Sequence, residues 1–110
     1  MRVAIVGSRS LTISNLGNFL PENTTEIISG GARGIDTCAR EYALSNGIPL
    51  REFLPDYERY GRRAPLVRNF SIVDHADYVL AFWDGKSRGT VHTLRYCIEK
   101  NLPHRIVKCI

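Results

Sequence analysis

The segment that decides the fold is Ile27-Ile28-Ser29-Gly30-Gly31-Ala32-Arg33-Gly34-Ile35-Asp36. It begins in an apolar run that predicts a strand over residues 25–29. It ends in a predicted amphipathic helix over residues 35–45, because apolar side chains recur there at the i, i+3, i+4, i+7 spacing. A strand that leads through glycines into a helix leaves backbone N–H groups free at the positive end of the helix dipole. Such a turn suits phosphate.

A second glycine-containing turn follows the most apolar run of the chain. Residues 77–83 predict a strand that is covered on both faces, and residues 84–90 (DGKSRGT) lead from it into a helix predicted over residues 90–99. Ser87 or Thr90 can cap this helix. The same hydroxyls and free N–H groups can also bind phosphate, and their position after a strand favours the ligand role.

Five strand-like runs alternate with helix-like runs along the whole chain. The other strands are predicted over residues 2–6, 50–54 and 105–110, with 50–54 at a sheet edge, and the other helices over residues 13–20 (capped by Thr12) and 66–75. Strict alternation predicts a single α/β domain over residues 1–110, with a five-stranded, mostly parallel sheet of order 3-2-1-4-5. The loops after strands 1, 2 and 4 then converge on one crevice at the switch point.

Composition favours an anionic ligand and argues against several other classes. The net charge is +4, and many arginines fall in predicted loops. Cys38, Cys97 and Cys109 form no C-x-x-C pair and are expected to be buried free thiols, and the three histidines lack the spacing of metal ligands. We therefore expect no metal site. With no apolar run long enough for a membrane span and no signal cleavage site, we expect no membrane partner and a cytoplasmic location.

Three features keep two interpretations each. Residues 55–65 are predicted as irregular, and their mixture of tyrosines and arginines fits either a flap that stacks on a base or a solvated crossover loop. Arg68 and Asn69 lie off the apolar stripe of their helix, so spacing alone indicates only a solvated face. Asp36 can accept hydrogen bonds from a ligand or stabilise its own helix start, and the structural role is favoured.

The glycine turn at residues 30–34 has the spacing of neither the G-x-G-x-x-G motif nor the P-loop motif.

Taken in order, residues 7–9, 29–36, 68–69 and 81–90 resemble the signature blocks of the SLOG superfamily. This superfamily includes the DNA-processing protein DprA (Smf), the cytokinin-activating LOG phosphoribohydrolases, and small standalone proteins related to YpsA and YspA. The resemblance covers essentially the whole chain, and residues 57–65 resemble the standalone branch in particular. It implies a Rossmann-like three-layer fold and a site for a nucleotide or nucleotide-derived ligand. Residues 30–34 and 87–90 would form the phosphate cradle, with Arg68 and Asn69 at the pocket wall.

The chain lacks features on which two activities of the superfamily depend. The LOG motif P-G-G-x-G-T-x-x-E has a catalytic Glu three residues after the Thr, and that position is Thr93 here. Without the carboxylate, the ribosyl centre cannot be activated in that way. DprA-like proteins bind single-stranded DNA but carry additional domains. Neither activity is transferred to this chain.

The leading hypothesis is a nucleotide-binding sensor module with a phosphate cradle and no required cofactor. The alternatives are a phosphoribohydrolase-like nucleotide hydrolase that uses Asp36 or Asp84, and a single-stranded nucleic-acid binder. Homo-oligomerisation is left open. The nucleic-acid hypothesis relies on six arginines: Arg9, Arg33, Arg59, Arg62, Arg63 and Arg88. The ligand-binding residues are expected to be Gly7, Ser8, Arg9, Gly30, Gly31, Ala32, Arg33, Gly34, Asp36, Arg68, Asn69, Asp84, Ser87, Arg88, Gly89 and Thr90.

Overall fold

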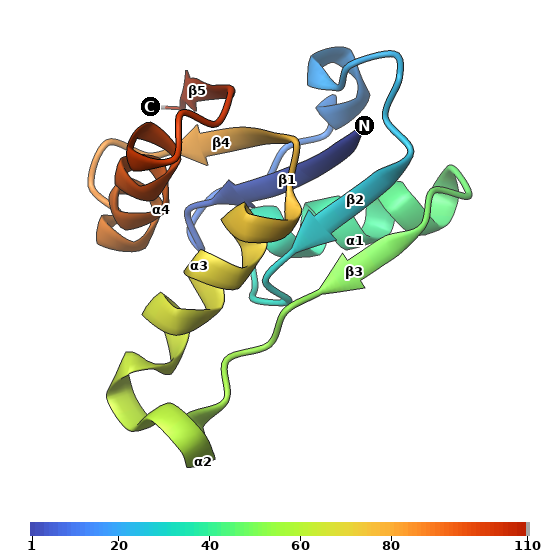
Figure 1. The fold of residues 1–110 in the computed structure, drawn as a ribbon. Helices are drawn as coiled ribbons and strands as arrows, with labels where there is room; N and C mark the ends of the chain where they lie inside the picture. The colour runs from blue at the N-terminus through green and yellow to red at the C-terminus, as the bar shows by residue number, and fades with distance from the viewer. Residues whose placement is uncertain (110) are drawn as a thin grey trace.

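The computed structural model describes residues 1–109 and contains a five-stranded parallel sheet in the order β3-β2-β1-β4-β5 (Figure 1). All four strand pairings are parallel, which confirms the predicted sheet and its order. The strands are β1 (Arg2–Gly7), β2 (Glu26–Ser29), β3 (Leu50–Glu52), β4 (Tyr78–Trp83) and β5 (His104–Lys108). Strand β3, which was expected at a sheet edge, lies at one.

Helices cover both faces of the sheet and make it the middle of three layers. On one face, α1 (Ile35–Ser45) and the short 3-10 helix η1 (Leu16–Phe19) pack against side chains such as Ile5, Ile27 and Phe82. On the other face, α3 (Ala64–His75) and α4 (Arg88–Glu99) pack against the alternate residues of the same strands, such as Ala4 and Ile28. Because successive side chains of a strand point to opposite faces, the central strands contribute to an apolar core on each face of the sheet.

The bounds or type of several predicted segments need correction. The helix expected over residues 13–20 with a Thr12 cap is only η1, which starts after Asn15 and has no side-chain cap. Gly17 and Asn18 are weak helix formers, and a single turn is enough to bury Leu16, which is 2% exposed. Helix α4 also begins two residues earlier than expected. The last predicted strand ends at Lys108, and its residue 110 lies outside the described residues.

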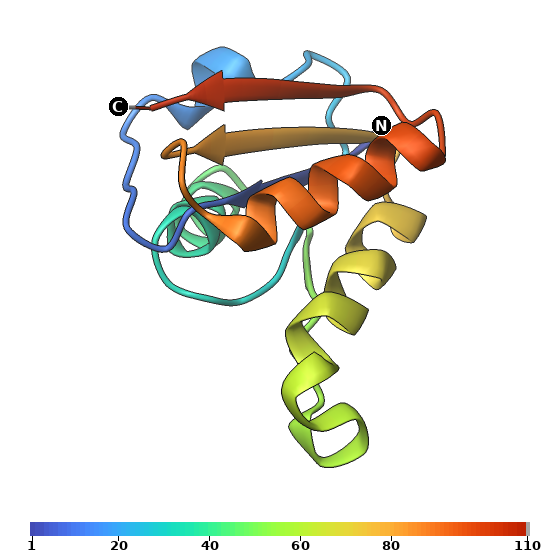
Figure 2. The ribbon, with the colours of Figure 1, turned by 90° about the vertical axis from the view of Figure 1, so that its left-hand side faces the viewer.

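The segment 55–65 is helical rather than irregular. It contains α2 (Tyr57–Tyr60), the 3-10 helix η2 (Gly61–Arg63) and the first residues of α3. The Asp56 side chain caps α2 by accepting a hydrogen bond from the Arg59 N–H at 3.1 Å, and Pro65 is tolerated in the first turn of α3. Residues 57–63, named the arm below, contain no buried side chain and project from the body of the molecule (Figure 2).

The cysteines are free thiols within the described part of the chain. Cys97 is buried between the sheet and α4, and burial raises the pKa of its thiol to about 11. Cys38 and Cys109 are only half-buried, so the expectation of burial is wrong for these two. Across residues 1–109, no helix combines the length and the apolar character that crossing a membrane requires.

Candidate functional site

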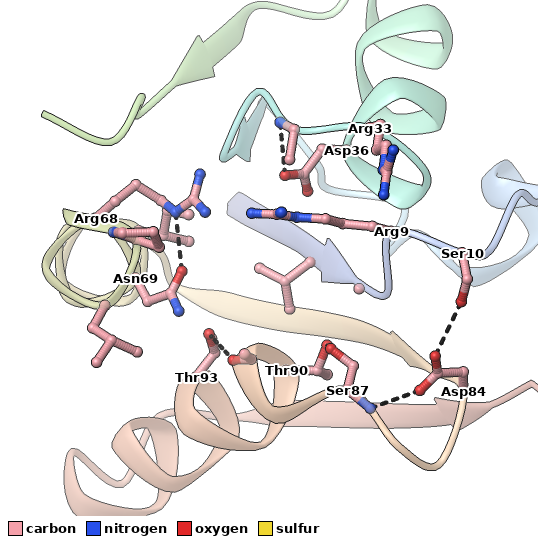
Figure 3. Close-up of a pocket in the computed structure, with 17 residues that line it drawn as sticks. Arg9, Ser10, Arg33, Asp36, Arg68, Asn69, Asp84, Ser87, Thr90 and Thr93 are labelled. Carbon is pink, nitrogen blue, oxygen red and sulfur yellow. Dashed lines mark hydrogen bonds between the residues drawn. The ribbon is translucent and has the colours of Figure 1, made fainter. Parts of the chain in front are cut away.

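A cavity of about 660 Å³ lies where the carboxyl ends of β1, β2 and β4 face the first turns of α1 and α4 and one side of α3. The loops that were expected to converge do meet there, because parallel strands end at the same edge of the sheet. Figure 3 shows this cavity with its lining side chains. These are Val6, Gly7, Arg9, Ser10, Ala32, Arg33, Asp36, Pro65, Leu66, Arg68, Asn69, Ile72, Asp84, Ser87, Gly89, Thr90 and Thr93.

Five of the predicted ligand residues do not line the cavity. Ser8 is 1% exposed, and its hydroxyl accepts a hydrogen bond from the Asp84 N–H at 3.1 Å. Gly30, Gly31 and Gly34 belong to the turn between β2 and α1 but do not line the cavity. Arg88 is exposed outside it, because Thr90 faces inward and two residues of α-helix reverse the direction of a side chain.

Arg68 is held inside the protein by two hydrogen bonds. Its Nη1 donates to the Gly30 carbonyl at 2.6 Å. Its Nε donates to Asn69 Oδ1 at 3.0 Å, the bond that is dashed in Figure 3. A Cβ atom at Gly30 would collide with this guanidinium, which explains the glycine. Burial lowers the pKa of Arg68, and the nearby Asp36 carboxylate opposes this shift. Arg68 therefore joins α3 to the end of β2, and its remaining N–H groups stay at the cavity wall.

Asp36 secures the glycine turn from within. The side chain is 8% exposed, and Oδ2 accepts a hydrogen bond from the Ala32 N–H at 3.1 Å. Burial raises the pKa of this carboxyl group, while the Ala32 bond and the Arg68 charge act in the opposite direction. The turn closes at Gly34, where φ is +74° and the Arg9 backbone leaves no room for a side chain. The geometry thus gives Asp36 the structural role that was favoured.

Asp84 organises the start of α4. One carboxylate oxygen accepts hydrogen bonds from the N–H groups of Lys86 and Ser87 at 2.8 Å, and the other accepts from the Ser10 hydroxyl at 3.0 Å. These bonds lower the pKa of Asp84 to about 2. The alternative that a hydroxyl caps this helix is not what the structure shows, because Ser87 makes no side-chain cap bond and Thr90 Oγ1 donates to Ser87 Oγ at 3.3 Å.

Arg9 and Arg33 carry the free positive charge of the cavity. Both side chains are exposed, and neither forms a hydrogen bond or ion pair with any residue from 1 to 109. Figure 3 shows Arg9 extending across the cavity below Asp36, with the Arg33 guanidinium directed toward it. Across the cavity, the first turn of α4 contributes N–H groups that have no partner within the helix.

Several lining residues were missed by sequence reasoning. Ser10 is bound to Asp84, and Thr93 lies one turn after Thr90 on the same face of α4. This i, i+3 spacing was a signal that could have identified Thr93. No comparable signal marks the apolar lining residues, since their side chains look like ordinary core or surface positions: Val6, Pro65, Leu66 and Ile72.

A sequence model of the YspA, cpYpsA-related SLOG family matches residues 1–60. The chain belongs to this SLOG family. It is also similar to the Gene 61 protein of Mycobacterium phage D29, with 35% identity over 83 residues that cover 70% of this chain and 66% of the phage protein. The solved structure of DNA processing protein A (DprA) from Streptococcus pneumoniae shares the fold, with a TM-score of 0.76 and 23% identity. That match covers 99% of this chain and 50% of the DprA chain. This SLOG chain thus spans less than two thirds of either relative.

Proposed function

We propose that this SLOG protein binds a nucleotide or nucleotide-derived ligand in the cavity and acts as a sensor module. The observation that carries the proposal is the unpaired charge of Arg9 and Arg33 opposite the first turn of α4. Forked guanidinium donors and free helix N–H groups are both suited to phosphate oxygens. Membership of the SLOG family is in keeping with this proposal.

The charge balance of the cavity supports an anionic ligand. Its two carboxylates are already engaged, Asp36 by the Ala32 N–H and Asp84 by two backbone N–H groups and a hydroxyl. Neither neutralises Arg9 or Arg33 through an ion pair. A cavity of about 660 Å³ also falls in the range of pockets that hold small organic ligands.

Thermal melts with a panel of nucleotides and the matching nucleosides test the proposal. Nucleotides should raise the melting temperature much more than nucleosides, because the free donors suit phosphate. At a hundredfold excess over Kd the added stability is about 2.7 kcal/mol. Arg9→Ala and Arg33→Ala should remove the effect, while Arg95→Ala is the matched control, since Arg95 is exposed on α4 and outside the cavity. Equal effects of nucleoside and nucleotide would contradict a phosphate cradle.

Chromatography of the same mixtures distinguishes binding from hydrolysis. A sensor module returns the nucleotide unchanged, whereas a hydrolase releases a free base or a shortened phosphate chain. Asp36 is the cavity carboxylate whose pKa is raised by burial, so an Asp36→Asn variant is the informative one if product appears. Retained turnover in that variant would exclude Asp36 as the general acid or base.

A second candidate function is the binding of single-stranded nucleic acid, and the exposed arm favours it. Tyr57 and Tyr60 are 57% and 39% exposed, and they alternate with arginines that form no ion pair within residues 1–109. Exposed aromatic rings can stack on bases, and arginines can contact the phosphates. The structural relative DprA is a DNA processing protein. Affinity for an oligonucleotide that falls steeply with salt, and falls again in Arg62→Ala, would support this function.

A further inference from the structure

The Asn69 side chain presents a hydrogen-bond donor to the cavity. Asn69 is 9% exposed, and its Oδ1 accepts from Arg68 Nε at 3.0 Å. The amide cannot be reversed, because its nitrogen would then face another donor. Nδ2 is therefore the atom turned toward α4, as Figure 3 shows, and it has no hydrogen-bond partner among residues 1–109. Nδ2 keeps some exposure to the cavity, so it can donate a hydrogen bond to a ligand there.

Thr93 presents the complementary acceptor. It is 2% exposed and lines the same cavity from α4. Its hydroxyl donates its one hydrogen to the Gly89 carbonyl at 3.1 Å, one turn earlier in the helix. The lone pairs of Thr93 Oγ1 remain, so this side chain can accept a hydrogen bond from a ligand but has no hydrogen left to donate.

The part of the cavity around Asn69 and Thr93 is more apolar than the part around Arg9 and Arg33. Pro65, Leu66 and Ile72 of α3 line the cavity on the Asn69 side and offer it apolar surface. The free guanidinium groups belong to Arg9 and Arg33, on the loops at the ends of β1 and β2. A ligand with a charged end and a flat, partly apolar end fits both parts at once.

We propose that Asn69 Nδ2 and Thr93 Oγ1 together recognise the nucleoside part of the ligand through a neighbouring acceptor and donor. The inference rests on the proposed function and adds the residues that determine specificity. Two sources on a nucleotide supply this chemistry. One is the pair of ribose hydroxyls, and the other is a base edge that has an acceptor beside an N–H group. Arg68 is a positioning residue, because it fixes which atom of the Asn69 amide faces the cavity.

Calorimetric titration with ADP, GDP, 2′,3′-dideoxy-ADP and inorganic pyrophosphate tests the inference. Pyrophosphate reports on the anion-binding part alone, so each variant is judged by its nucleotide affinity relative to its pyrophosphate affinity. Thr93→Val removes the acceptor, and Thr93→Ser retains it. Asn69→Asp keeps an oxygen for Arg68 but removes the donor. Ser71→Ala, on α3 outside the cavity, is the control variant.

Thr93→Val and Asn69→Asp should each lower the nucleotide affinity about tenfold or more relative to pyrophosphate, the effect of one lost hydrogen bond to a buried group. Thr93→Ser and Ser71→Ala should change it little. Loss of the variant effect with dideoxy-ADP assigns the pair to the ribose, whereas an effect that persists there and differs between ADP and GDP assigns it to the base. Either result supports the inference.

Unchanged relative affinities in both Thr93→Val and Asn69→Asp would overturn the inference and leave the proposed anion site intact. The same conclusion follows if the wild-type protein binds pyrophosphate as tightly as every nucleotide. If the wild-type protein binds none of the four probes, the proposed function itself fails, and the inference fails with it.

Discussion

The hydrogen bonds of Arg68 predict that Arg68→Met destabilises the ligand-free protein. Methionine retains much of the apolar stem but cannot reach the Gly30 carbonyl or Asn69 Oδ1, to which Arg68 donates at 2.6 and 3.0 Å. The substitution also removes the cation beside the buried Asp36 carboxylate. Each loss leaves a polar group in the protein without the partner that compensates its burial.

The expected cost follows from these contacts. A hydrogen bond that involves a charged group contributes about 1.5–3 kcal/mol, and the return of a partly buried guanidinium to water offsets part of the loss. We therefore expect the free energy of unfolding to fall by about 2–3 kcal/mol. For a chain of this length the melting temperature should fall by roughly 10 °C.

Urea unfolding without ligand at neutral pH measures this effect, and Arg33→Met is the matched control. Arg33 is exposed and makes no hydrogen bond or ion pair with the rest of residues 1–109, so its loss should change stability by less than about 0.5 kcal/mol. Equal stability of the two variants would refute the structural role of Arg68.

The pH dependence supplies a second check on the same variant. The folded-state pKa of Asp36 is raised, so its contribution to stability is full below its ordinary pKa and is lost as the pH rises through the folded value. Without Arg68 the pKa should rise further, since an attractive cation is gone. The free energy of unfolding that Arg68→Met loses should therefore become smaller as the pH is lowered. Adding Asp36→Asn to Arg68→Met should restore part of this free energy at pH 7. A deficit that is constant with pH would show that Asp36 is not coupled to Arg68.

Four further predictions concern other parts of the molecule. Arg9→Ala and Arg33→Ala should each weaken nucleotide binding by about 1.5–3 kcal/mol, whereas Arg88→Ala should have a smaller effect by calorimetry, because it lies outside the cavity. Asp84→Ala should lower the melting temperature near neutral pH. Since the folded pKa of Asp84 is about 2, this difference should be full above its ordinary pKa and should shrink as the pH falls from about 4 toward 2. Gly34→Ala should destabilise the protein in urea, because φ there is +74° and the Arg9 backbone is adjacent. A chelator should leave the melting temperature unchanged, since none of the described residues form a group of three or more side chains suited to a metal ion.

The sheet and the meeting of its loops could be predicted from local patterns alone. Alternation of strand-like and helix-like runs predicts a parallel sheet with helices on both faces, and the expected doubly wound order β3-β2-β1-β4-β5 is the one observed. Once the strands are parallel, their carboxyl ends must share one edge. That is why the segments around Gly7, Ala32 and Ser87 line a common cavity although they are far apart in the chain.

The two elements predicted incorrectly depended on local signals that compete. Residues 13–20 have helical spacing but include glycine and asparagine, and only the single turn η1 forms. Residues 55–65 contain two prolines and a glycine, yet the Asp56 cap and the tolerated position of Pro65 allow α2 and the start of α3. Propensity alone could not decide either case.

The roles of the individual polar side chains were decided by the tertiary structure. Spacing alone indicated a solvated face for Arg68, but in the structure Arg68 lines the cavity and donates a hydrogen bond to the Gly30 carbonyl, 38 residues away. The same contact determines which atom of Asn69 faces the cavity, and the inward turn of Thr90 leaves Arg88 outside. Sequence determines which segments reach the site, because strand and helix patterns are local. Which side chains stay free for a ligand depends on partners that only the folded chain brings within hydrogen-bond distance.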